Sequence, residues 1–148
     1  MKSTTILSSL LFTLASASPI ARASSEIDVT GFTAQTNPNG DGASISFTVT
    51  IPTTSISSTP CTYADVTSSN HLPDVPMTTC ADSSLRFQFR QDPTQPGAGE
   101  GRYRLVVVYT PGSGSEGLAG YQEWDASDFV TEEDVTYEGA PDFTLTAA

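Results

Sequence analysis

The residues of this chain that could do chemistry lie mainly in an acidic stretch of its second half. After Arg104 there is no basic residue, and nine acids follow: Glu116, Glu123, Asp125, Asp128, Glu132, Glu133, Asp134, Glu138 and Asp142. Such a stretch can form a divalent-cation site, a face for a basic partner, or a solvated surface that keeps the protein soluble. A metal site needs convergent ligands, which a sequence does not show. We therefore favour the solvated surface, then the basic partner, and predict no metal site.

Two aromatic residues within this stretch are candidate recognition anchors. Trp and Tyr dominate the energetics of many protein interfaces, and Tyr121 and Trp124 stand among the acids. Trp124 can equally fill a core, which is the interpretation we favour for it, whereas Tyr121 stays open between the two roles. The predicted interaction surface consists of Tyr121, Glu123, Asp125, Asp128, Glu132 and Glu133.

Catalytic arrangements are weakly supported. Glu123 and Asp125 flank Trp124, and a glycosidase uses two carboxylates that face each other across a cleft. Residues two apart on a strand project side by side instead, so this pair does not have that geometry. His71 is the only histidine. No Gly-x-Ser-x-Gly nucleophile turn is present, and no phosphate-binding or dinucleotide-binding motif has its required context. We predict no catalytic residues, no enzyme activity and no cofactor.

One segment resembles the start of a calcium-binding loop. Asn37, Asn39, Asp41 and Gly42 match its first ligand positions and its glycine. The position that requires a bidentate glutamate is Thr48, which belongs to a well-patterned strand. The segment is therefore predicted to be a hairpin turn.

Charge and length limit the remaining classes. The chain has 148 residues and a net charge of −11, which disfavours binding to nucleic acids or to anionic membrane surfaces. Residues 1–17 have a positive start, an apolar run and a small-residue cleavage site, as a secretory signal peptide does. No apolar run approaches the ~20 residues of a membrane-spanning helix. We predict a secreted, extracellular protein with a flexible segment over 18–27 and one β-domain over 28–148.

The two cysteines and the strand pattern predict the fold. In an oxidising compartment Cys61 and Cys80 are expected to form a disulfide. Alternation of apolar and polar residues predicts strands, and the run of three valines at 106–108 predicts a central strand covered on both faces. The predicted strands are 29–35, 43–51, 61–66, 85–90, 102–110, 119–124 and 143–146. With glycine-rich turns and no convincing helix, the fold class is all-β, a compact antiparallel β-barrel or sandwich with one disulfide.

The arrangement of these features resembles the small secreted fungal proteins related to the Alternaria major allergen. The resemblance covers roughly residues 28–147 and rests on the following residues: the strand 45–49, Pro60-Cys61, Cys80-Ala-Asp82, Phe87-Gln-Phe89, the strand 105–109 and the ending 137–143. It implies a compact β-barrel or sandwich without recognised catalytic residues. It also implies export by a fungus and roles as an effector, elicitor, allergen or ligand carrier.

Two functions follow as hypotheses. The first is a non-enzymatic, fungal effector-like or elicitor-like protein that binds an extracellular protein of a plant host, with a basic protein favoured as partner because the chain is acidic. The alternative is a carrier that holds an apolar small molecule in its barrel. The sequence leaves the oligomeric state, the host target and the identity of any small ligand open.

Overall fold

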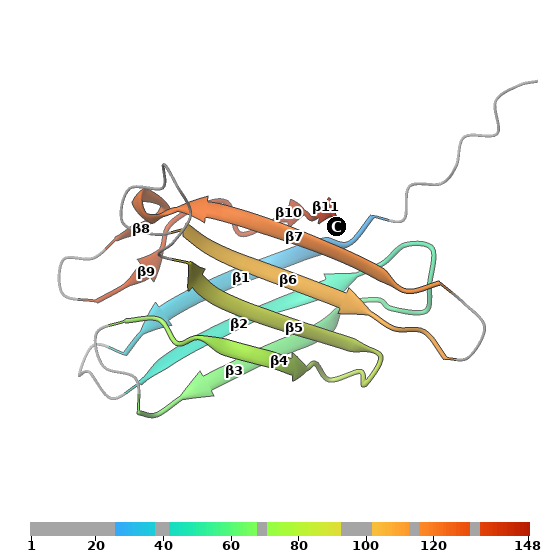
Figure 1. The fold of residues 1–148 in the computed structure, drawn as a ribbon, viewed down its shortest axis with the longest axis horizontal. Helices are drawn as coiled ribbons and strands as arrows, with labels where there is room; N and C mark the ends of the chain where they lie inside the picture. Colours follow the sequence, from blue (N-terminus) through green and yellow to red (C-terminus); the bar gives the residue numbers. More distant parts are fainter. Residues whose placement is uncertain (1–25, 38–41, 68–70, 93–101, 113–115, 131–133) are drawn as a thin grey trace, which may run out of the picture.

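The chain folds almost entirely into strands, which form two antiparallel sheets stacked as a sandwich (Figure 1). This computed structural model describes residues 26–37, 42–67, 71–92, 102–112, 116–130 and 134–148. The sheets are not closed into a barrel. Of the two predicted architectures, the sandwich is therefore confirmed.

The two sheets have the following composition. Sheet A has the strand order β3-β2-β1-β9-β8, and β10 pairs with the other half of β1; its strands are β1 (Asp28–Thr36), β2 (Ala43–Thr50), β3 (Thr59–Asp65), β8 (Phe129–Val130), β9 (Thr136–Tyr137) and β10 (Phe143–Thr144). Sheet B has the order β11-β7-β6-β5-β4; its strands are β4 (Val75–Thr79), β5 (Leu85–Asp92), β6 (Arg102–Tyr109), β7 (Leu118–Asp125) and β11 (Thr146–Ala147). A single 3-10 turn, η1 (Ala126–Asp128), follows β7.

The inner faces of both sheets are formed by the alternating apolar residues. Along β2, every second residue from Ala43 to Val49 is buried, and the serines and threonines between them are partly exposed. On β5 the buried residues are Leu85, Phe87 and Phe89. This period of two matches the pleat of a strand, so one face of each sheet faces the other sheet.

Aromatic rings fill the space between the sheets. Phe32 of β1 stacks on Trp124 of β7 with ring centroids 4.9 Å apart. Its ring also lies within 6.3 Å of four others, those of Phe47, Phe89, Tyr137 and Phe143. Trp124 is only 7% exposed, so its predicted place in the core is confirmed.

The disulfide joins the two sheets at neighbouring edges. Cys61 lies on β3 of sheet A, and Cys80 follows β4 of sheet B, with their Cα atoms 4.4 Å apart. Next to it, the Ala81 N–H donates to the Pro60 carbonyl at 3.0 Å. The predicted disulfide is thus confirmed, and it lies where the two edge strands meet.

The strand predictions are mostly confirmed, with three differences. β6 is the central strand of sheet B, but Val106 and Val108 are half-buried on an outer face that no other sheet of the described residues covers, so the prediction of cover on both faces is wrong. The predicted strand at 143–146 is divided at Leu145 between β10 and β11, which pair with different sheets. β4, β8 and β9 were not predicted, because they are short or lack clear alternation.

The predicted signal peptide at 1–17 lies outside the described residues. Ile27, the last residue of the predicted flexible segment, is 3% exposed, and its carbonyl accepts a hydrogen bond from the Leu145 N–H at 2.9 Å. Within the described part of the chain, no helix has the length and apolar character needed to cross a membrane.

Candidate binding surface

The predicted interaction residues fall on the outer face and the end of β7. Tyr121 and Glu123 project from the outer face of sheet B, because the buried Gly120 and Trp124 alternate with them. Tyr121 is thus a surface residue and not part of the core, while its role as a recognition anchor stays a prediction. Figure 1 shows β7 beside β6, with η1 at its end.

A neighbouring arginine holds both of these side chains. The Arg104 guanidinium lies 4.7 Å from the centroid of the Tyr121 ring, within range of a cation–π interaction. Its Nε atom is 3.6 Å from Oε1 of Glu123, which stands directly opposite on β7. Because both side chains are a third or more exposed, this ion pair contributes little to folding stability. Its consequence is that the Tyr121 and Glu123 side chains are positioned before any partner binds.

The acidic part of the surface lies at the end of the same strand. Glu123, Trp124, Asp125 and Asp128 line a polar hollow of about 310 Å³. Glu123 and Asp125 belong to β7, and η1 follows it, so that Asp128 lines the same hollow. The structure thus brings three of the predicted carboxylates together. Glu132 and Glu133 lie outside the described residues.

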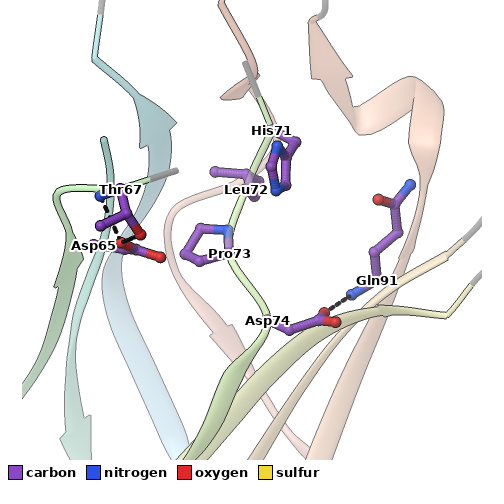
Figure 2. Close-up of a pocket in the computed structure, with 7 residues that line it drawn as sticks. All are labelled: Asp65, Thr67, His71, Leu72, Pro73, Asp74 and Gln91. Carbon is purple, nitrogen blue, oxygen red and sulfur yellow. Dashed lines mark hydrogen bonds between the residues drawn. The ribbon is translucent and has the colours of Figure 1, made fainter. Parts of the chain in front are cut away.

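A second hollow, of about 430 Å³, lies where β3 ends, β4 begins and β5 ends (Figure 2). It is lined by Asp65, Thr67, His71, Leu72, Pro73, Asp74 and Gln91. The carboxylates of Asp65 and Asp74 accept hydrogen bonds from the backbone N–H groups of Thr67 and Gln91, at 2.8 and 3.2 Å. These bonds fix the local loop conformation, so a structural role accounts for both carboxylates. His71 is exposed, as a loop histidine is expected to be.

The predicted interaction residues did not include the basic residues of this face. Arg86, Arg90 and Arg104 all project outward from sheet B, alternating with buried residues of β5 and β6. Their grouping depends on the register that sets Arg90 of β5 opposite Arg104 of β6, which no single segment of the sequence shows.

Aromatic rings fill the interior of the sandwich in the described part of the chain. Ring centroids inside the sandwich approach to between 4.0 and 6.3 Å, and the hollows described above are lined largely by surface residues. Burial raises the pKa of Tyr103, whose ring lies between Phe89 and Phe129, and so keeps its hydroxyl protonated. Among the described residues, no three His, Cys, Asp or Glu side chains gather as metal ligands would. Of the calcium-like segment, Asn39 and Asp41 lie outside the described residues, while Gly42 precedes β2 with φ +126 and Thr48 lies on β2.

Comparisons of the chain with protein-family models and with curated proteins find no match.

Proposed function

We propose that this protein is a non-enzymatic secreted binding protein with a role like that of fungal effectors or elicitors. Its partner would be a basic extracellular protein of a plant host. The observation that carries this proposal is the grouping of Glu123, Asp125 and Asp128 around one polar hollow beside the positioned Tyr121 side chain. A pre-positioned aromatic residue beside charged groups has the composition of a protein-binding surface.

The disulfide supports an extracellular location. Disulfides persist in oxidising compartments, and Cys61 and Cys80 are paired in the folded chain. The net charge of −11 would steer a basic partner toward the protein and would make association fastest at low salt.

The alternative role of ligand carrier has less support. A carrier needs an apolar cavity, and the aromatic rings of the two sheets occupy the centre of the sandwich. Native mass spectrometry of the secreted protein provides a direct test, because a carrier would retain a small molecule through purification.

The partner hypothesis is tested by capture from plant apoplastic fluid. Oxidised protein starting at Ser18 is immobilised, and the bound proteins are compared with those captured by Asp125→Asn/Asp128→Asn. The matched control is Glu26→Gln/Glu116→Gln, which removes the same charge from exposed positions outside this hollow. We expect one enriched basic protein whose capture falls with the first variant and with added salt but persists with the control. Equal capture by all three proteins would refute the assignment of the partner to this surface.

A further inference from the structure

Three arginines of this acidic protein lie on one face. Of the six basic residues in the chain, Lys2 and Arg22 lie outside the described residues, and the other four all belong to β5 and β6. Arg86 and Arg90 are exposed on the outer face of sheet B, and Arg104 is half-exposed beside them. A protein of net charge −11 thus carries a locally basic pair, Arg90 and Arg104, which stand opposite each other, while Arg86 lies opposite Val108 and outside this pair.

Two of these arginines place like charges on opposed positions of neighbouring strands. Arg90 and Arg104 stand directly opposite in the β5–β6 register, where like charges are unfavourable. Each guanidinium is held by a different neighbour. Arg90 donates to Oε1 of Gln88 at 3.1 Å, and Arg104 lies over Tyr121. A carboxylate placed at this pair would relieve the repulsion, because guanidinium groups bind carboxylates through paired, charge-assisted hydrogen bonds.

One hydrogen-bond donor of Arg104 has no acceptor within the described residues. Its Nε atom is shielded from solvent and has no hydrogen-bond partner in the described part of the structure. The nearest charged group, the Glu123 carboxylate, is 3.6 Å away, beyond ordinary hydrogen-bond length. Glu123 therefore offsets the charge of Arg104 incompletely, and it would compete with an incoming carboxylate.

Apolar side chains complete the surface. Val106 and Val108 lie on the same outer face as Arg104 and are only half-buried. Met77 on the adjoining edge strand β4 is 41% exposed. Arginine, tyrosine and methionine beside an apolar centre are the residue types enriched at protein interfaces.

The chemistry of the surface selects its occupant. A dense polyanion would be repelled by the net charge of −11 more strongly than a segment with fewer carboxylates, and it would leave the valines uncovered. A second copy would bring another net charge of −11 against this one, which opposes association. A polypeptide segment that carries both carboxylates and apolar side chains fits the charge and the valines together.

We propose that the outer face of sheet B binds an acidic polypeptide segment. Its carboxylates are held by Arg90 and Arg104, and its apolar side chains cover Val106 and Val108. This partner is opposite in charge to the one assigned to the acidic hollow, so the two proposals can fail separately.

The test measures binding of a labelled peptide of alternating glutamate and valine to the oxidised protein by fluorescence anisotropy. We expect binding that weakens with salt and an affinity about tenfold lower for Arg90→Gln/Arg104→Gln. Arg86→Gln, which removes a charge from the same strand but outside the opposed pair, is the matched control and should change affinity less than about threefold. Glu123→Gln should increase affinity, because it removes the internal competitor. A merely structural role of Glu123 would not produce that gain.

Three outcomes would overturn the proposal. The first is no binding of the peptide by the unmodified protein. The second is equal affinity of the unmodified protein and Arg90→Gln/Arg104→Gln, with circular dichroism showing that both are folded. The third is equally tight, arginine-dependent binding of polygalacturonate, which has carboxylates but no apolar side chains and would identify the face as a polyanion site.

Discussion

The outer faces of the two sheets differ, although their inner faces are alike. On sheet A, with Asp28 and Gln35 as exceptions, most outward residues of β1, β2 and β3 are small and neutral: Thr30, Thr33, Ser44, Ser46, Thr48 and Thr62. On sheet B, with Ala119 as an exception, the outward residues of β5, β6 and β7 are mostly longer and include charged and aromatic side chains: Arg86, Gln88, Arg90, Arg104, Val106, Val108, Tyr121 and Glu123.

This difference separates what the fold needs from what a binding surface needs. A sandwich requires only that outward residues tolerate water and suit an extended backbone, which the threonines and serines of sheet A do. Folding gives no reason to place Arg90 opposite Arg104, because the pairing opposes stability. The residue types of sheet B are those that the proposed binding of an acidic segment would require, and sheet A supplies a control surface within the same molecule.

The largest effect is expected in the shared interior. Phe32→Ala removes the ring that touches Phe47 and Phe89 as well as Trp124, and should lower the free energy of unfolding by about 3–5 kcal/mol. Thr30→Ala, on the outer face of the same strand, should cost less than about 1 kcal/mol. Urea denaturation measures both. Similar losses for the two variants would contradict the division into inner and outer faces.

The disulfide ranks next. Replacing Cys61 and Cys80 by alanine frees a loop whose ends are 19 residues apart and should lower stability by about 3 kcal/mol on the chain-entropy account. The two edges would remain linked by the hydrogen bond from Ala81 to Pro60. Thermal unfolding of the variant, compared with the oxidised and the reduced parent, measures the loss. A variant as stable as the oxidised parent would show that the link between the sheets is energetically unimportant.

A buried hydroxyl should come third. Thr36 is 3% exposed, and its Oγ1 accepts a hydrogen bond from the Val135 N–H at 2.9 Å. Thr36→Val leaves that N–H without an acceptor and should cost about 1–3 kcal/mol. Thr36→Ser keeps the oxygen and should retain most of the stability. Denaturation curves measure the free energy of unfolding of both variants. An equal loss would mean that packing, and not the hydrogen bond, accounts for the change in stability.

Alkaline pH should lower the free energy of unfolding through the buried Tyr103 side chain. Burial raises the pKa of Tyr103 above its usual 10.0, so near pH 10 the unfolded chain loses this proton while the folded chain keeps it. The unfolded state then binds fewer protons, and stability falls as the pH rises from about 10 through the raised pKa. Tyr103→Phe should make this fall shallower in denaturation curves recorded from pH 8 to 11. An unchanged slope would remove Tyr103 as its source.

The smallest effect is the one that distinguishes the outer faces. A double-mutant cycle of Arg90→Gln and Arg104→Gln should reveal a repulsion of about 0.2–1 kcal/mol at low salt that fades as salt is added. The matched cycle on sheet A pairs Thr30→Ala with Thr48→Ala, which also stand opposite each other. That coupling should not depend on salt. Salt-independent coupling at the arginines would mean that the two guanidiniums do not oppose each other in solution.

The secondary structure could be predicted from local pattern where a strand is long. The alternation from Ala43 to Thr50 fixed both the strand and its buried face, and it was confirmed. The three valines at 106–108 led to a wrong prediction of cover on both faces. A run of apolar residues does not show whether a second layer covers the strand or whether neighbouring side chains on the same face shield it. Short strands such as β8 and β9 have only two residues each and carry no periodicity to detect.

The candidate surface was only partly predictable. Tyr121, Glu123, Asp125 and Asp128 were chosen from residue type and proximity in sequence, and the structure brings the three acids to one hollow. Arg104 was missed because its relation to Tyr121, Glu123 and Arg90 depends on which strands pair and in what register. Register is set by the whole hydrophobic pattern and by the turns, so it is not a property of any one segment.

The sequence by itself determined the all-β class, the disulfide pairing, the core position of Trp124 and the acidity of the molecule. Each of these follows from local alternation, from the presence of only two cysteines, or from composition. Only the tertiary structure decided that the two sheets remain an open sandwich and that Leu145 divides the last strand between them. It alone placed Arg90, Arg104 and Glu123 side by side. Those facts depend on contacts between strands far apart in the chain, whose geometry is set by packing rather than by neighbouring residues.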